Sequence, residues 1–90
     1  MAWVAILMGS ESDWPTMQAT TAVLDALQIK FEVKVTSAHR TPAATQEYVA
    51  DAETRGCKVF ICAAGMAAHL AGAVAAHTQR PVIGVPVDSG

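Results

Sequence analysis

Short apolar segments alternate with helical patterns along the chain, and this alternation constrains the fold more than any other feature. Four segments have the composition of strands: residues 3–8, 30–36, 59–62 and 82–85. The connections between them are short enough to be right-handed crossovers, which place parallel strands in one sheet. The sequence therefore predicts a three-layer α/β fold with the order β-α-β-α-β-α-β, whose sheet stops after its fourth strand.

The first two strand segments differ in their hydrophobic pattern. Residues 3–8 form the continuous apolar run WVAILM, which is typical of a strand in a parallel sheet that is covered on both faces. Residues 30–36 alternate polar side chains with Phe31, Val33 and Val35. A period of two predicts a half-exposed strand, and we expect this one to lie near an edge of the sheet.

The first helical pattern follows the first strand. Either Ser12 or Asp13 is expected to cap this helix, Pro15 is tolerated in its first turn, and the helix is expected to end near Gln28. Its expected inner face consists of residues at helical spacing: Met17, Thr20, Thr21, Leu24 and Leu27.

Two further helices are expected. One begins at Thr41-Pro42 and ends at Gly56, which lacks a Cβ and can adopt a left-handed conformation. Its expected inward residues are Ala44, Tyr48 and Ala52. The other, over residues 66–77, carries small residues at i, i+4 and i+8, a stripe that permits tight packing: Ala68, Gly72 and Ala76.

Length and composition fit a single small domain over residues 1–90. Ninety residues correspond to about one domain, because domains average roughly 100–200 residues. The chain is 52% hydrophobic and 16% charged, which is too apolar for a disordered protein. The net charge is −2, and the six basic residues form no cluster that would neutralise a polynucleotide. Nucleic acid is therefore not an expected partner.

Cysteine usage and hydropathy indicate the compartment. Cys57 and Cys62 are the only cysteines and form no CxxC pair, so neither a disulfide framework nor a zinc site is predicted. We expect a reduced, cytoplasmic setting. The uncharged run over residues 59–79 is nominally long enough to span a bilayer, but it contains glycine, histidine, threonine and glutamine and much weakly apolar alanine. No membrane association is expected.

Ligands of open α/β sheets bind outside the carboxyl ends of the strands, so the segments after each strand are the candidate site. The first of these, residues 9–13, contains neither a dinucleotide fingerprint nor a nucleotide-binding P-loop, and those motifs occur nowhere else in the chain. The Gly9-Ser10 turn can present backbone N–H groups, a hydroxyl and a helix N-terminus to a phosphate or carboxylate. The alternative is a plain strand-to-helix turn.

The segment after the second strand, residues 37–42, concentrates more chemistry. Arg40 can hold a phosphate through two hydrogen bonds, Ser37 can donate or accept one, and His39 titrates near neutral pH and can move a proton. The alternative is a solvated loop that only starts a helix. His69 has either a structural or a chemical role, and His77 is expected at the surface. The two histidines have no carboxylate or cysteine at metal-ligand spacing, so no metal site is expected.

Four segments together resemble one known family. Residues 8–14 (MGSESDW) are similar to its motif MGSxSDW, and residues 37–42 match its SAHRTP. Residues 67–70 (AAHL) with Gly72 resemble its AAHLPG, and residues 81–87 (PVIGVPV) follow in the same order and spacing. On these motifs the chain resembles the amino-terminal portion of the PurE family.

The resemblance implies a flavodoxin-like fold and the activity of an N5-carboxyaminoimidazole ribonucleotide mutase, which moves a carboxylate from N5 to C4 of the imidazole in de novo purine synthesis. It implies a small-molecule ribonucleotide substrate, no cofactor and no metal, and a homo-octamer. It assigns the proton shuttle to His39 and substrate contacts to Ser10, Asp13 and Arg40, with Ser37 close by. It further implies that residues 65–70 line the imidazole and carboxylate end, which includes Gly65, Ala67, His69 and Leu70.

Three positions depart from the family pattern. Ala63 and Met66 stand where the family usually has glycine, and Ala71 replaces the proline of AAHLPG. A side chain at 66 either narrows the carboxylate pocket or requires the loop to reshape. Two alternatives to the mutase therefore stay open: direct carboxylation of aminoimidazole ribonucleotide by CO2, and a truncated, non-catalytic domain that binds a phosphate ligand or serves only in assembly.

Overall fold

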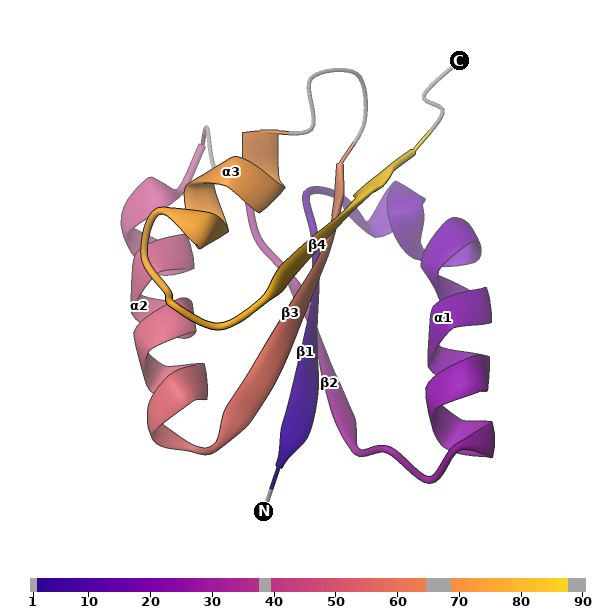
Figure 1. Ribbon diagram of the computed structural model, residues 1–90. Coiled ribbons are helices and arrows are strands. Elements are labelled where there is room, and N and C mark those ends of the chain that lie inside the picture. The colour runs from indigo at the N-terminus through magenta and orange to yellow at the C-terminus, as the bar shows by residue number, and fades with distance from the viewer. Residues whose placement is uncertain (1, 38–39, 65–68, 88–90) are drawn as a thin grey trace.

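The computed structural model describes residues 2–37, 40–64 and 69–87, which form a parallel sheet with helices on both faces (Figure 1). The strands are β1 (Trp3–Met8), β2 (Phe31–Val35), β3 (Cys57–Ala64) and β4 (Val82–Pro86). The helices are the 3-10 helix η1 (Glu11–Asp13), α1 (Trp14–Ala26), α2 (Pro42–Thr54) and α3 (His69–Ala75). All strand pairs are parallel and the strand order is β2-β1-β3-β4. The predicted fold class is confirmed, and β2 lies at an edge as expected.

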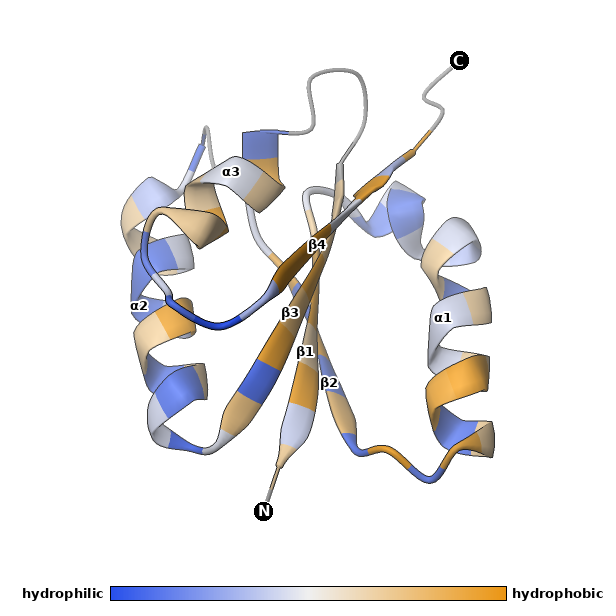
Figure 2. Cartoon of the chain, in the orientation of Figure 1, coloured by the Kyte–Doolittle hydropathy of each residue, from blue (hydrophilic) through white to orange (hydrophobic). Residues whose placement is uncertain are grey.

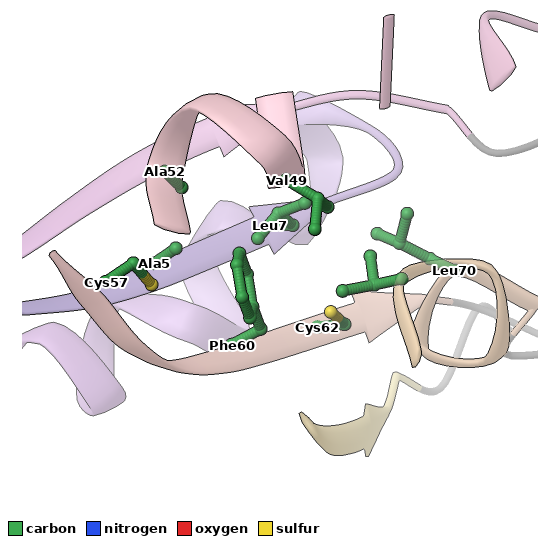
Figure 3. Close-up of a cluster of buried hydrophobic side chains, with 9 residues drawn as sticks. Ala5, Leu7, Val49, Ala52, Cys57, Phe60, Cys62 and Leu70 are labelled. Atoms are coloured by element: carbon green, nitrogen blue, oxygen red, sulfur yellow. The ribbon is translucent and has the colours of Figure 1, made fainter. Parts of the chain in front are cut away.

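Alternating side chains of β1 divide the core between the two faces of the sheet. Ala5 and Leu7 point toward α2 and α3, where the larger cluster also contains Phe60, Val49 and Leu70 (Figure 3). The opposite cluster packs under α1 and consists of Ile6, Met8, Met17, Leu24 and Ala63. Hydrophobic residues therefore concentrate on the central strands, while the hydrophilic residues lie mostly on the helices and their connections (Figure 2). This arrangement confirms that the first strand is covered on both faces.

The third strand begins two residues earlier than its sequence pattern predicts. Trp3 lies opposite Cys57, but the next residue, Val4, lies opposite Val59, so Lys58 is an extra residue in the ladder. Such a bulge changes which residues share a face. Cys57 and Phe60, three positions apart, consequently both enter the same core cluster.

The start of the first helix differs from the expectation. Asp13 holds the N-cap position of α1, which is one of the two predicted positions, but the short helix η1 precedes α1 and has its own cap, because the Ser10 hydroxyl accepts a hydrogen bond from the Ser12 N–H. Among the described residues the Asp13 side chain makes no capping hydrogen bond. The turn after α1 contains Gln28 at φ 59°, and the expected left-handed residue after α2 is confirmed, since Gly56 has φ 100°.

Several residues expected to face inward are exposed. Leu27 is 63% exposed because α1 ends at Ala26 and Leu27 belongs to the following turn. The buried stripe of α2 is Thr45, Val49 and Ala52, so Ala44, one position and about 100° earlier, faces solvent.

The expected tight packing of the small-residue stripe is also wrong where the structure describes it. Helix α3 buries Leu70 and Val74, so Gly72 and Ala76 lie on the outside, and Ala68 lies outside the described residues. None of the described helices is long and apolar enough to cross a membrane.

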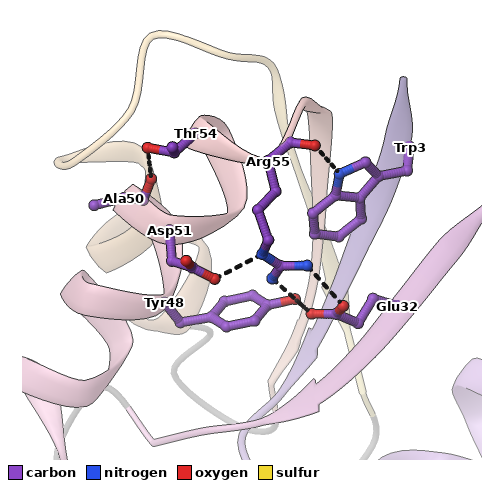
Figure 4. Close-up of polar contacts among 7 residues, drawn as sticks. All are labelled: Trp3, Glu32, Tyr48, Ala50, Asp51, Thr54 and Arg55. Atoms are coloured by element: carbon purple, nitrogen blue, oxygen red, sulfur yellow. Dashed lines mark hydrogen bonds and ion pairs between the residues drawn. The ribbon is translucent and has the colours of Figure 1, made fainter. Parts of the chain in front are cut away.

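In strand β2 the valine side chains are exposed, and the face with the charged side chains packs against a helix. Val33 and Val35 are exposed, because α1 is the only described α-helix on their side of the sheet and it covers mainly β1. The other face of β2 meets α2 through polar groups (Figure 4). The Tyr48 hydroxyl donates a 2.6 Å hydrogen bond to Glu32, and Lys34 lies 5.7 Å from the centre of the Tyr48 ring. These contacts fix α2, and hence the segment that precedes it, against the edge of the sheet.

Candidate functional site

The carboxyl ends of all four strands lie at the same end of the sheet, at the top of Figure 1. Met8, the last residue of β1, is in register with Val35 of β2 and with Ala63 of β3. Ala64 of β3 is likewise in register with Pro86 of β4. The segments that follow β1 and β2 therefore emerge beside one another, which is where the sequence predicted a site.

The segment after β1 has a fixed backbone and exposed hydroxyls. The Gly9 N–H donates to the carbonyl of Ala63 at 3.4 Å, and the Asp13 N–H donates to the carbonyl of Ser10 at 3.0 Å. The hydroxyls of Ser10 and Ser12 lie 2.9 Å apart. Ser10 is exposed and Asp13 is half-buried. The turn thus presents a pair of hydroxyls and a carboxylate in front of α1.

Ser12 is a further candidate for the site, although the sequence predicted for it only a role as a helix cap. Its hydroxyl lies within hydrogen-bond distance of Ser10, the predicted substrate contact. Either oxygen can be the donor, so the pair can offer a proton to one acceptor and lone pairs to one donor. The spacing SxS immediately before an acidic residue was the available signal for this pair.

After β2, the described residues Arg40 and Thr41 are hydrogen-bonded to Ser37. The Ser37 hydroxyl accepts a hydrogen bond from the Arg40 N–H at 3.0 Å. The Ser37 carbonyl accepts from the Thr41 N–H at 3.0 Å and from the Thr41 hydroxyl at 3.1 Å. Arg40 is exposed and Ser37 is half-buried, so the guanidinium is available to a ligand at the strand ends. His39 lies outside the described residues.

The predicted residues after β3 divide into two groups. His69 is exposed at the first position of α3, the helix that follows β3, and β3 neighbours β1 on the side away from β2. Leu70 is only 3% exposed and packs in the core cluster with Val74, so its side chain contributes to the interior. Gly65 and Ala67 lie outside the described residues. The structure therefore brings Ser10, Asp13, Ser37 and Arg40 onto neighbouring segments, with His69 after the next strand.

An apolar hollow of about 460 Å³ lies beside the first of these segments. It is lined by Met8, Glu11, Trp14 and Val33, which come from β1, η1, α1 and β2. A larger hollow of about 640 Å³ is lined by residues that include Glu53, His77 and Arg80. These residues precede β3 and β4, so the larger hollow lies at the amino ends of the strands, away from the candidate site. The smaller one is lined by Glu11, which follows Ser10 in the chain, and is the better match to a ligand site.

The chemistry of the described residues narrows what the site can do. No three histidine, cysteine or acidic residues among the described part of the chain lie close enough together to hold a metal ion. Burial raises the pKa of the Cys62 thiol to about 12 and also raises the pKa of Cys57. Both cysteines are therefore protonated at neutral pH, and neither is suited to be a nucleophile. The groups available at the strand ends are hydroxyls, a carboxylate, a guanidinium and histidine.

Residues 3–90 match a protein family described as AIR carboxylase. The chain belongs to this family. The match confirms the resemblance that the four motifs indicated, and it covers every described element of the fold.

Curated relatives and solved structures agree with the family. The chain is 55% identical over 86 residues to the N5-carboxyaminoimidazole ribonucleotide mutase of Vibrio vulnificus, covering 96% of this chain and 53% of that protein. It is 56% identical over 86 residues to the mutase of Bacillus subtilis, with the same coverage. The crystal structure of Treponema denticola PurE superimposes with a TM-score of 0.91 at 27% identity, covering 99% of this chain and 57% of that one. The chain thus spans about half the length of the curated relatives it matches.

Proposed function

We propose that this chain carries the substrate site of an N5-carboxyaminoimidazole ribonucleotide mutase. The observation that carries the proposal is the placement of two polar segments, those of Ser10 and Ser37, at the ends of the paired strands β1 and β2. The choice of this reaction is supported by relatives at 52–56% identity that are named as this mutase.

Each side chain has a task in this proposal. The Arg40 guanidinium, next to a segment whose backbone is fixed by Ser37, holds the substrate phosphate through charge-assisted hydrogen bonds. The Ser10 and Ser12 hydroxyls and the Asp13 carboxylate bind the ribose and phosphate end. Residues 65–70 line the imidazole end, by resemblance to the family motif.

The proposed reaction conserves atoms and charge. The bond between N5 and the carboxylate carbon breaks, CO2 leaves, and N5 gains a proton. C4 of the imidazole then attacks the CO2, a new C–C bond forms, and C4 loses its proton. His39 is proposed to supply the first proton and to accept the second, so its net protonation state is unchanged over a turnover. A group that titrates near pH 7 suits both transfers.

One specific observation favours a second candidate. The family description refers to carboxylation of aminoimidazole ribonucleotide rather than to the mutase reaction. The direct carboxylase forms the same C4 carboxylate but takes CO2 from solution. A third candidate, a non-catalytic module, would bind the ribonucleotide or take part in assembly without turnover.

Turnover assays separate these candidates. We expect C4-carboxylated product from N5-carboxyaminoimidazole ribonucleotide without added CO2, and none from aminoimidazole ribonucleotide plus CO2. The reverse pattern would identify the carboxylase. Binding without product from either substrate would identify the non-catalytic module.

In an active protein, His39→Asn should abolish turnover and leave substrate affinity within about twofold, since the phosphate contacts stay intact. Wild-type turnover in that variant would contradict the proton-shuttle assignment.

We further propose a cytoplasmic homo-octamer that acts on a small-molecule ribonucleotide with no nucleic-acid or membrane partner and no cofactor, and that residues 1–90 form one α/β domain of it. The support is the family resemblance together with the even, slightly acidic charge distribution. Light scattering of the purified protein, with its intact mass measured in parallel, tests the assembly. A monomer at micromolar concentration would contradict the octamer.

A further inference from the structure

Two buried threonine hydroxyls contact each other directly beneath the segment that contains Ser37 and Arg40. Thr36 follows β2 and is 6% exposed, and Thr45 lies in α2 and is 2% exposed. Their Oγ1 atoms are 2.7 Å apart. Buried hydroxyls of this kind are held in place only if their hydrogen bonds are satisfied, so the pair has a defined geometry.

Counting protons gives the direction of these hydrogen bonds. The Thr45 Oγ1 also lies 3.2 Å from the Thr41 carbonyl and 3.5 Å from the Ser37 carbonyl. Each hydroxyl has one proton to donate. Both protons are used when Thr36 donates to Thr45 and Thr45 donates to the Thr41 carbonyl. The two hydroxyls then form a continuous chain from the end of β2 to the segment above.

The same chain is tied to the central strand. The Thr36 N–H donates a 2.8 Å hydrogen bond to the carbonyl of Met8, the last residue of β1. The segment of Ser10 begins two residues after Met8. Thr36 therefore connects the end of β1, through its own hydroxyl and that of Thr45, to the backbone that positions Ser37 and Arg40.

We infer that Thr36 and Thr45 are positioning residues, which hold Ser37 and Arg40 in place relative to Ser10 so that all three bind one ligand. This inference rests on the proposed function. Packing alone would not give the same result, because an apolar pair of equal shape would fill the space but would remove the hydrogen bond between Thr36 and Thr45, which links the end of β2 to α2. A displacement of about 1 Å in a binding constellation can reduce catalysis by roughly 100-fold.

The variants that test this inference keep the shape of the side chains. Valine is close in shape to threonine but lacks the hydroxyl, so Thr45→Val and the double variant Thr36→Val/Thr45→Val remove the hydroxyl chain. Thr45→Ser restores the hydroxyl. The matched control is Thr21→Val, because Thr21 is also a buried helical threonine whose hydroxyl donates to a main-chain carbonyl, that of Gln18 at 2.7 Å. Thr21 lies in α1, on the other face of the sheet.

Four quantities are measured on each variant: the urea midpoint, the amide hydrogen exchange of Arg40 and Thr41, the affinity for aminoimidazole ribonucleotide, and the turnover of its N5-carboxylated form. The double variant should keep nearly the wild-type midpoint, because apolar groups replace both partners and the Thr41 and Ser37 carbonyls retain backbone donors. Its exchange at Arg40 and Thr41 should rise about 10-fold, and its affinity and turnover should fall about 10-fold or more. Thr45→Ser should stay within about twofold of wild type, as should the ligand affinity of Thr21→Val.

Other outcomes overturn the inference. If the double variant keeps its affinity and turnover within twofold of wild type, the inference is wrong, whether or not its hydrogen exchange increases. An equal loss of affinity in Thr21→Val would also do so, since the effect would then be global. A wild-type protein that neither binds nor converts the ribonucleotide refutes the proposed function and, with it, this inference. The two failures are therefore distinguishable, because the first requires an active wild-type protein.

Discussion

The Arg55 guanidinium donates two parallel hydrogen bonds, each 3.0 Å long, to the two oxygens of the Glu32 carboxylate. Arg55 also lies 4.8 Å from the centre of the Trp3 ring, while its carbonyl accepts a hydrogen bond from the Trp3 indole N–H (Figure 4). The end of α2 is thereby joined to both β1 and β2 at the amino edge of the sheet. Thr36 and Thr45 connect the same helix to the carboxyl end of β2.

The Glu32 contact predicts a pH-dependent part of the folding stability. The Arg55 hydrogen bonds, and then that of Tyr48, hold the pKa of Glu32 below its ordinary value of 4.5. A lowered pKa in the folded state means that this contribution is fully present above about pH 4.5 and is lost as the pH falls through the folded-state pKa. Glu32→Gln should therefore lower the free energy of unfolding at pH 7 by about 0.5–1 kcal/mol, a value reduced for solvent screening of this partly exposed pair.

Urea unfolding of wild type and Glu32→Gln at pH 7 and at acid pH checks this prediction. The two midpoints should converge as the pH falls below 4.5. Glu47→Gln, which changes an exposed carboxylate of α2, is the control and should follow wild type more closely at both pH values. A gap that stays constant with pH would mean that Glu32 acts through packing rather than charge.

Two glycines should respond to alanine with opposite signs. Gly56 has φ 100°, a conformation that alanine adopts only with strain, so Gly56→Ala should destabilise the fold by about 1 kcal/mol or more. Gly72 lies within α3, and a Cβ there would meet no atom within 4 Å among the described residues outside the backbone of its own helix. Gly72→Ala should therefore stabilise the fold by about 0.5–1 kcal/mol through higher helix propensity. Thermal unfolding of both variants decides, and a loss of stability in Gly72→Ala would reveal a close neighbour of α3.

The two thiols should be unreactive in the folded protein. Both cysteines are buried, and burial raises the pKa of Cys62 to about 12. Because the thiolate is the reactive form, a disulfide reagent at pH 8 should modify neither thiol in the native state and both after denaturation in urea. Rapid modification without denaturant, located with Cys57→Ala and Cys62→Ala, would show that the core opens locally around the modified residue.

The proposed phosphate contact predicts a large loss of affinity on removal of one side chain. Arg40→Ala should weaken binding of the ribonucleotide by about 1.5–3 kcal/mol, or roughly 10- to 150-fold, as expected for hydrogen bonds to a charged group. Arg80→Ala, which removes an arginine that pairs with Glu53 at the amino edge of the sheet, is the matched control and should leave affinity unchanged. Titration calorimetry measures both, and equal affinity in Arg40→Ala and wild type would exclude the phosphate assignment.

Much of the fold was predictable from local pattern. The apolar run WVAILM predicted a strand covered on both faces, the alternation in residues 30–36 predicted an edge strand, and Gly56 predicted a left-handed helix end. Inner faces were less predictable. Helical spacing alone does not give the rotation of a helix on the sheet, so Ala44 and Leu27 were assigned to the core although both are exposed.

The residues of the candidate site could be selected from the sequence, whereas the hydroxyl pair that we propose to support them could not. Ser10, Asp13, Ser37 and Arg40 could be selected because short polar segments follow strands, and parallel strands end at one edge. Thr36 and Thr45 gave no signal, since isolated threonines occur in strands and helices for many reasons. Only the packing of α2 on β2 reveals that their hydroxyls meet.

The sequence by itself determined the order of the elements, the class of the fold and the family, because hydrophobic periodicity, turn residues and motifs are local properties of the chain. The tertiary structure alone decided the polar contacts between the region of α2 and that of β2. Glu32 contacts Arg55 near the amino ends of the strands, and Thr36 contacts Thr45 at their carboxyl ends. Each of these contacts joins residues 9 to 23 positions apart. Their partners are set by the rotation and translation of a helix on a sheet, which result from the packing of the whole core and are encoded in no single segment.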